Sequence, residues 1–209
     1  MEMTAGQLIK DLTVLGILLF WPLIPLFWIP VHLFTRLFRR LGRFTYIAAF
    51  ALWSACALAV ISFRKALLAA SIHVWPLLAA AGWVIFALGL LLHVWTIWLL
   101  RGRIIGTGEL GLEIAKLETR GAFSLCRHPT YLAHMMIFWG AAAATGSAAV
   151  TAVAAADLLL TLLLIVPLEE KELRERFGSQ YEDYCSKVPP LMPRPFRGKK
   201  LLKFFSCLH

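Results

Sequence analysis

The chain has 209 residues, of which 60% are hydrophobic and only 16% are charged, and its mean hydropathy is +0.74. Soluble domains are considerably more polar, so this composition excludes an ordinary soluble domain and predicts an integral membrane protein. The formal net charge of +9 could suggest a nucleic-acid partner. We predict none, because the basic residues flank membrane-length apolar segments and suit contact with anionic membrane lipids.

Apolar segments of membrane-spanning length determine the predicted fold. A spanning helix needs roughly 20 mostly apolar residues, because a rise of about 1.5 Å per residue then covers a hydrocarbon core of about 30 Å. The first two such segments are residues 12–34, interrupted by three prolines that can kink a helix, and residues 44–63. A third segment, 67–100, exceeds one span, and polar residues before Pro76 predict a loop that precedes a helix over 75–100.

The last apolar segment, residues 130–166, is nearly twice the length that one span needs. Thr145-Gly146-Ser147 near its middle is its best turn signal and predicts a tight hairpin of two helices. The sequence therefore predicts an all-α, polytopic membrane bundle with about five transmembrane helices, in a single domain over residues 1–209. The predicted spans are 12–34, 44–63, 75–100, 130–145 and 148–166, followed by a cytoplasmic tail over 167–209.

The positions of the basic residues support this topology, because Lys and Arg accumulate on cytoplasmic loops. With five spans and the N-terminus outside, 18 of the 21 Lys and Arg residues fall on inner segments, and only Lys10, Arg64 and Lys65 fall outside. We therefore expect a multi-pass protein whose functional site and C-terminus face the cytoplasm, with the basic tail near anionic lipid.

The predicted tail begins with an amphipathic helix, since apolar residues recur there at steps of three or four. They are Leu173, Phe177, Tyr181, Tyr184 and Val188. This apolar face packs against the bundle or lies in the membrane interface, and the two tyrosines could also cover a ligand. Gly178 costs a helix about 1 kcal/mol relative to alanine, so a break near it is expected.

A charged cluster lies where the fourth predicted span begins. Pro129 suits a first helical position, where its missing N–H group would be unpaired anyway, and this places Arg127 and His128 at the mouth of the helix. A helix start favours an anion, and an arginine beside it can bind a carboxylate through two hydrogen bonds. The alternatives are that Arg127 anchors the chain to lipid phosphate and that His128 caps the helix.

Two carboxylates follow the fifth predicted span. Glu169 and Glu170 come after Pro167, at the predicted negative end of the helix dipole, so we expect a cationic or hydrogen-bond-donating group to meet them. The alternative for Glu170 is a surface ion pair with Arg174, four residues later. Glu169 has a leucine at that spacing, which favours a functional role for it.

Three further polar residues fall inside predicted spans. Asp157 is costly in lipid and should face the bundle interior, either with a structural partner such as Trp139 or a threonine, or in a substrate tunnel. His134, about one turn into the fourth span, could border a ligand bound at its start. His93, in the third span, is more typical of a histidine satisfied within a helix bundle.

Taken together, these residues resemble the isoprenylcysteine carboxyl methyltransferase family and its bacterial, archaeal and phospholipid-methylating relatives. The resemblance covers roughly the C-terminal half and depends on the motifs in combination. The matching residues are Leu117-Glu118-Thr119-Arg120-Gly121-Ala122-Phe123, Arg127-His128-Pro129-Thr130-Tyr131, Glu169-Glu170, Leu173, Phe177-Gly178, Tyr181, Tyr184 and Val188-Pro189. The chain departs from the family pattern at Ala122-Phe123, Ala133 and Pro190, and Arg194 is the candidate substitute for a tail arginine.

The resemblance implies an integral membrane methyltransferase that uses S-adenosylmethionine, bound between the last spans and the tail. Arg127 and Glu169 are the implied catalytic residues. The implied cofactor-binding residues are Arg127, His128, Tyr131, His134, Glu169, Glu170 and Tyr181. Methyl transfer is an in-line displacement that depends on alignment and partial desolvation, so no metal is needed. We expect Arg127→Ala and Glu169→Ala each to weaken cofactor binding without unfolding the bundle.

The implied acceptor is a lipid or a prenylated amphiphile that enters from the membrane. The pattern Phe177-Gly178, Tyr181 and Tyr184 favours the carboxylate of an isoprenylcysteine, and a phospholipid amine is the alternative. A sterol-type reductase that uses NADPH has a related Arg-His-x-x-Tyr pattern, but Thr130 replaces its usual asparagine and this chain is far shorter. A non-enzymatic transporter or assembly factor is the last alternative, although no inverted repeats support it.

Overall fold

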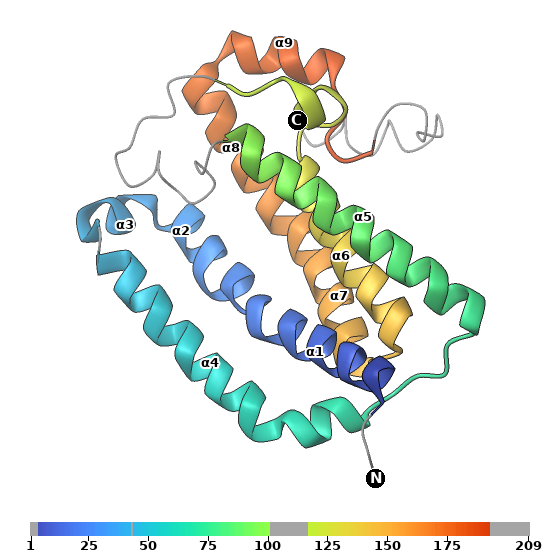
Figure 1. The fold of residues 1–209 in the computed structure, drawn as a ribbon. Coiled ribbons are helices and arrows are strands. Elements are labelled where there is room, and N and C mark those ends of the chain that lie inside the picture. The colour runs from blue at the N-terminus through green and yellow to red at the C-terminus, as the bar shows by residue number, and fades with distance from the viewer. Residues whose placement is uncertain (1–3, 43, 101–116, 193–209) are drawn as a thin grey trace.

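The computed structural model describes residues 4–42, 44–100 and 117–192 (Figure 1). Every regular element in these ranges is a helix, and a single isolated β-bridge joins Ser71 to Ser147. The predicted all-α membrane bundle is therefore confirmed. Arg194 and the basic end of the tail lie outside the described residues.

The first apolar segment folds as a chain of short helices because its prolines interrupt regular hydrogen bonding. Helix α1 (Ala5–Phe20) passes into a π-helical turn, η1 (Ile24–Trp28), then into α2 (Ile29–Leu33) and α3 (Thr35–Leu41). The helix begins seven residues before the predicted span, because the Thr4 hydroxyl caps its start by accepting a hydrogen bond from the backbone N–H of Gln7.

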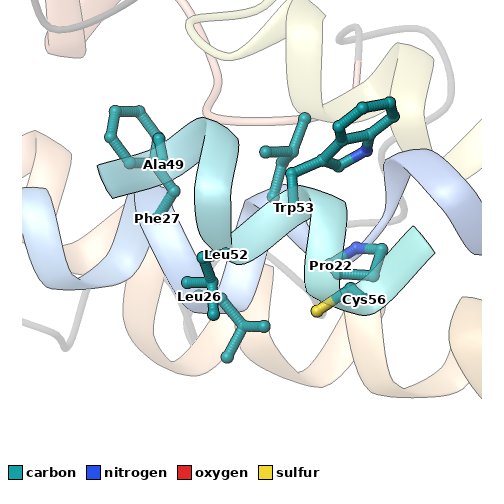
Figure 2. Close-up of a pocket in the computed structure, with 8 residues that line it drawn as sticks. Pro22, Leu26, Phe27, Ala49, Leu52, Trp53 and Cys56 are labelled. Carbon is teal, nitrogen blue, oxygen red and sulfur yellow. The ribbon is translucent and has the colours of Figure 1, made fainter. Parts of the chain in front are cut away.

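Helices α4 (Phe44–Ala69) and α5 (Pro76–Leu100) are separated by the expected loop. Helix α4 extends six residues beyond the predicted span and crosses the bundle beside α1, where the Trp53 indole N–H donates to the carbonyl of Leu19 at 2.8 Å. Its described side chains are otherwise largely exposed, as suits a helix that faces lipid. A narrow apolar groove runs between η1 and α4, lined by Leu26, Trp53 and Cys56 (Figure 2).

The predicted hairpin is present as α6 (Pro129–Thr145) and α7 (Ala148–Leu160). Gly146 ends α6 with a left-handed conformation (φ 67°), and the Ser147 hydroxyl caps α7 by accepting from the N–H of Val150 at 3.3 Å. The turn is fastened to the α4–α5 loop, because Ile72 N–H donates to the carbonyl of Gly146 at 2.6 Å.

Glycines bring α5 and α6 into backbone contact along their length, and the two helices cross closely in Figure 1. A β-carbon at Gly82 would lie 2.5 Å from the backbone nitrogen of Ala144, and one at Gly140 would lie 2.5 Å from that of Phe86. In lipid, where the hydrophobic effect does not drive helices together, such close approach supplies the van der Waals contact that holds them.

Helix α7 does not end where the fifth span was predicted to end. It continues through a π-helical turn, η3 (Thr161–Ile165), into α8 (Val166–Phe177), so an unbroken helix runs from Ala148 to Phe177. The predicted amphipathic helix breaks at Gly178 (φ 50°), after which α9 (Ser179–Lys187) folds over one end of the bundle (Figure 1).

Among the described residues, four helical segments are long and apolar enough to cross a membrane: Ala5–Phe27, Phe44–Ala69, Pro76–Leu100 and Ala148–Phe177. Helix α6 has 17 residues, which is only the minimum length of roughly 17 for a span. The count of five spans therefore stays a prediction. The start of α6 and helices α8 and α9 share one end of the bundle, which we call the α9 end (Figure 1). The α4–α5 loop lies at the other end.

Candidate functional site

The start of α6 is held in place by the segment that follows α9. A 3₁₀ turn, η2 (Gly121–Ser124), leads into this region. The backbone N–H of Arg127 donates to the carbonyl of Pro189 at 2.8 Å, and that of His128 donates to the carbonyl of Pro190 at 2.9 Å. The sequence showed Pro190 only as a departure from a family pattern, and it carried no signal for this role of the two proline carbonyls.

Arg127 is the cation that meets Glu170. Its Nε and Nη2 groups both donate to Oε1 of Glu170, with Nε at 3.1 Å, and its Nη1 group donates to the carbonyls of Cys185 and Val188 at 3.2 and 3.0 Å. The Arg127 and Glu170 side chains are 10% and 12% exposed. Each guanidinium nitrogen is thus used within the protein, and Arg127 ties α6 to both α8 and α9.

His128 lies between the two carboxylates and is 2% exposed. Its Nε2 atom is 3.2 Å from Oε1 of Glu170, and its Nδ1 atom is 3.3 Å from Oε2 of Glu169. Burial alone would lower the pKa of His128, but hydrogen bonding to Glu169 and Glu170 and their negative charges outweigh it, so the pKa is raised above its usual value. His128 occupies the N-cap position of α6, but its side chain makes no capping hydrogen bond there. In its protonated form the imidazole satisfies both carboxylates instead.

The expectation that Glu169 and Glu170 lie at the negative end of a helix is wrong, because the helix continues to Phe177. A cationic group does meet them, as expected, and it is supplied across the bundle by Arg127 and His128. The alternative pair for Glu170 is also present, since Arg174 Nη2 lies 3.3 Å from its Oε2. Glu170 therefore forms both ion pairs at once, the buried one with Arg127 and the more exposed one with Arg174.

The aromatic face of the tail packs inside the protein. Tyr181 and Tyr184 form a cluster with Leu117, and the Tyr184 hydroxyl donates to the carbonyl of Phe123. Tyr181 is fully buried, and within the described chain its hydroxyl has no hydrogen-bond partner. Burial raises the pKa of both tyrosines, so both stay neutral. Tyr184 is thereby a packing residue, and Tyr181 is the tyrosine with unused hydrogen-bonding capacity.

Tyr131 and His134 lead from this cluster into the bundle. The Tyr131 ring is stacked 5.7 Å from that of His128 and packs against Ile29 and Leu191. His134 follows one turn later, with its ring 6.2 Å from Tyr131 and 4.9 Å from His93 of α5. His134 thus lies deeper in the bundle, beside His93, which the sequence analysis assigned only a bundle role. The structure places the other six predicted site residues together: Arg127, His128, Tyr131, Glu169, Glu170 and Tyr181.

Asp157 faces the bundle interior, as expected, and is 1% exposed. The suggested partner Trp139 is instead 41% exposed. The polar group that faces Asp157 is the indole of Trp21, the residue that follows α1, although no hydrogen bond satisfies either group within the described residues. Asp157 lies twelve residues before Glu169 on the same continuous helix, about 18 Å away along its axis, so it is not assigned to the carboxylate cluster.

The described cysteines, Cys56, Cys126 and Cys185, are free thiols. Burial raises the pKa of the Cys126 thiol to about 11, which makes it an unreactive packing residue. Cys185 contributes its backbone carbonyl to Arg127, and burial raises the pKa of its thiol. Neither thiol is suited to nucleophilic chemistry.

The donor set at the α9 end fits part of an S-adenosylmethionine molecule. The Glu169 side chain is 29% exposed and can accept from amino or hydroxyl groups, and Tyr181 presents a buried hydroxyl that lacks a partner. Arg127, by contrast, has its guanidinium committed to Glu170 and to two carbonyls. The fit therefore rests on Glu169 and Tyr181 more than on the arginine.

The comparison with known families agrees with this geometry. Residues 77–180 match the family model described as phospholipid methyltransferase. The match runs from the first residues of α5 through α8 and into α9, and so includes Arg127, His128, Glu169 and Glu170. No curated protein and no solved structure matches the chain.

Proposed function

The matched region, residues 77–180, belongs to the phospholipid methyltransferase family, and from that premise we propose that this chain is a membrane methyltransferase that uses S-adenosylmethionine to methylate a lipid-borne acceptor. The observation that carries the proposal is the buried cluster of Arg127, His128, Glu169 and Glu170 at the α9 end of an apolar bundle. Neither a reductase nor a transporter accounts for this family match.

The residues of the cluster divide into two roles. Arg127, His128 and Glu170 form the buried ion-pair network that fixes the start of α6 against α8. The Glu169 side chain is 29% exposed, and the Tyr181 hydroxyl has no hydrogen-bond partner within the described residues. We assign to these two side chains the amino, carboxylate or hydroxyl groups of the cofactor. When bound, S-adenosylmethionine supplies a methyl group activated by its sulfonium charge. The protein's contribution is to orient it and exclude water.

The acceptor is either the carboxylate of a prenylated cysteine or the amine of a phospholipid. The carboxylate alternative depended on the Phe177-Gly178, Tyr181 and Tyr184 pattern, and the packing of Phe177 and Tyr184 with Leu117 gives that pattern a structural explanation. The amine alternative is supported by the description of the matching family. In either case we propose that the acceptor enters laterally from the membrane.

The orientation of the site is likewise a proposal. Described basic residues gather at the α9 end, among them Arg120, Lys171 and Arg176, whereas Lys10 and Arg64 lie toward the opposite end. The excess of positive charge supports a cytoplasmic position for the α9 end, where soluble S-adenosylmethionine is available.

Titration calorimetry of the detergent-purified protein with S-adenosylmethionine tests the proposal, with NADPH titrated in parallel. We expect saturable binding of S-adenosylmethionine alone, and roughly tenfold or greater weakening in Glu169→Ala, because an ionic hydrogen bond contributes about 1.5–3 kcal/mol. Glu172→Ala is the matched control, since Glu172 pairs with Arg176 on the surface of the same helix. Binding of NADPH alone, or of neither compound, would refute the proposal.

A further inference from the structure

The first turns of α1, the α4–α5 loop and the α6–α7 turn lie together at the end of the bundle opposite the α9 end (Figure 1). They line a cavity of about 620 Å³, within the range of roughly 300–1,000 Å³ that is usual for small-ligand sites. Ser147 on its wall precedes Glu169 by 22 residues, about 33 Å along the helix that Ser147 caps. That distance exceeds a hydrocarbon core of about 30 Å, so the cavity and the carboxylate cluster lie at opposite membrane surfaces.

The backbone fixes two walls of this cavity. The α4–α5 loop is fastened to the hairpin turn by two hydrogen bonds, from Ile72 N–H to the carbonyl of Gly146 at 2.6 Å and from Ala148 N–H to the carbonyl of Ala70 at 3.0 Å. Helix α1 forms the third wall, but it is buried only from Val14 onward, where it joins the apolar core of the hairpin. Its first turns therefore leave a space that the protein itself does not fill.

Lys10 and Asp11 bring opposite charges to the cavity. The Asp11 carboxylate is oriented by Gln7, whose side-chain amide donates to its Oδ1 atom at 2.7 Å. Within the described residues, neither Lys10 nor Asp11 has an ion-pair partner. The cavity thus presents one cation and one oriented anion, side by side in the sequence, that no group of the described protein neutralises.

The membrane makes these two charges unusual. Both residues lie inside the helical segment Ala5–Phe27, which is apolar enough to span a membrane, and ionisable side chains in such segments are costly and usually functional. Lys10 is also one of three basic residues that the predicted topology leaves outside, against the usual bias of Lys and Arg toward the cytoplasm. Neither insertion nor orientation accounts for the pair, which favours a local binding role.

We propose that this cavity binds the headgroup of a zwitterionic phospholipid from the leaflet opposite the α9 end, with Lys10 holding the phosphate and Asp11 holding the ammonium group. A lysine ammonium donates strong, charge-assisted hydrogen bonds to phosphate oxygens. The carboxylate supplies the counter-charge for the ammonium group and repels a headgroup that is anionic as a whole. Apolar residues of the lining, Val14 and Leu68, belong to the core and suit the start of the acyl chains.

The occupant of this cavity is a resident lipid and not the methyl acceptor, because its headgroup lies at the membrane surface away from the carboxylate cluster. It contacts α1, the α4–α5 loop and the hairpin turn at once. Binding therefore holds the first turns of α1 to the rest of the bundle, where the helix is not buried. This role goes beyond the proposed function and does not depend on it.

Lipid binding to the full-length chain tests the proposal. The protein is released from a maltoside detergent in native mass spectrometry and titrated with dioleoyl phosphatidylcholine, with dioleoylglycerol, which lacks the headgroup, and with glycerophosphocholine, which lacks the chains. We expect the phospholipid to bind saturably and roughly tenfold or more tightly than either control, because an ionic hydrogen bond contributes about that much. Equal binding of dioleoylglycerol would overturn the headgroup site, and equal binding of glycerophosphocholine would assign it to a soluble phosphodiester instead of a lipid.

Replacing Lys10 locates the bound lipid. Lys10→Met keeps most of the apolar stem and removes the charge, so it should weaken phosphatidylcholine binding by roughly tenfold or more. Lys65→Met is the matched control, because Lys65 lies near the same end of the bundle on α4 but does not line the cavity. Equal unfolding temperatures of the two lipid-free variants check that the fold is retained. Equal losses in both variants, or a loss in neither, contradict the proposal.

Replacing Asp11 tests the preference for a zwitterion. Asp11→Asn keeps the oxygen that accepts from Gln7 and removes the negative charge. The wild-type protein should bind phosphatidylcholine more tightly than the anionic phosphatidylglycerol, and the variant should lower this ratio by roughly tenfold, since it loses the partner of the ammonium group and the repulsion of the anion. An unchanged ratio, or a wild-type preference for phosphatidylglycerol, would overturn the assignment of a zwitterionic headgroup.

Discussion

Removing the Glu170 carboxylate should destabilise the protein more than removing any nearby surface charge. In Glu170→Ala, the Arg127 guanidinium loses two hydrogen bonds and its counter-charge while only 10% exposed, and His128 loses one of its two carboxylates while 2% exposed. Breaking a buried ion pair by deleting one partner costs about 3–5 kcal/mol, because the other charge stays buried without compensation.

Two features place the expected loss near the lower end of that range. Arg127 keeps its hydrogen bonds to the carbonyls of Cys185 and Val188, and His128 can lose its proton and become neutral. We therefore expect a loss of about 3 kcal/mol in the free energy of unfolding. The same reasoning revises the expectation for Arg127→Ala, which should destabilise the bundle as well as affect the site.

The assay is reversible unfolding in mixed micelles, with Glu172→Ala as the matched control. Glu172 pairs with Arg176 four residues later on α8, as Glu170 does with Arg174. The Glu172 and Arg176 side chains are 23% and 24% exposed, and helix-surface pairs of this kind contribute only about 0.2–0.5 kcal/mol. A difference of less than about 1 kcal/mol between the two variants would refute the view that the cluster is a buried network. Glu170→Gln, which keeps the shape and one acceptor, should fall between them.

Three further predictions concern stability. The pKa of His128 is raised in the folded state, so its stabilising contribution is complete below about pH 6.5 and is lost as pH rises through the folded-state pKa. The difference in free energy of unfolding between wild type and His128→Gln should therefore shrink when the pH is raised from 6 to 9 in the same assay. Gly82→Ala should lower the free energy of unfolding by about 1–3 kcal/mol, because the added methyl group pushes α5 away from α6. Gly16→Ala is the control: Gly16 has open space around it, so this change should be neutral or stabilising by up to about 1 kcal/mol. Equal effects of the two variants in thermal denaturation would refute the close packing of α5 and α6. Gly178→Ala should cost about 1–3 kcal/mol through backbone strain alone, because φ is 50° and no atom lies within 4 Å of the added carbon, and loss of α9 protection in hydrogen exchange would show where that strain is relieved.

Several features of the fold were predictable because they depend on a few neighbouring residues. Pro129 starts α6, Gly146 ends it and Gly178 breaks the tail helix, and each acts through its own backbone conformation. The break before Pro76 follows from the same local chemistry. The π-helical turn at 161–165 was not predictable, since no proline or glycine lies within it and its apolar residues also suit an ordinary helix.

The candidate site likewise has features that the sequence predicts and features that depend on the tertiary structure. Composition and apolar length by themselves determined a membrane bundle, and the clusters at residues 127–131 and 169–170 marked the candidate site, because charge beside membrane-length apolar segments is costly and therefore informative. Only the tertiary structure decided how these residues are used. Arg127 and Glu170 are 43 residues apart, so their pairing depends on how α6 packs against α7 and on the continuation of α7 into α8.

Helix packing also brought together residues that the sequence kept separate. His93 and His134 meet because glycines let α5 approach α6 at backbone distance, and Trp21 rather than Trp139 faces Asp157 because α1 packs against α7. A sequence pattern reports which side chains share one helix face. Which faces oppose one another is set by the sum of many weak contacts over the whole bundle, and that sum exists only in the folded protein.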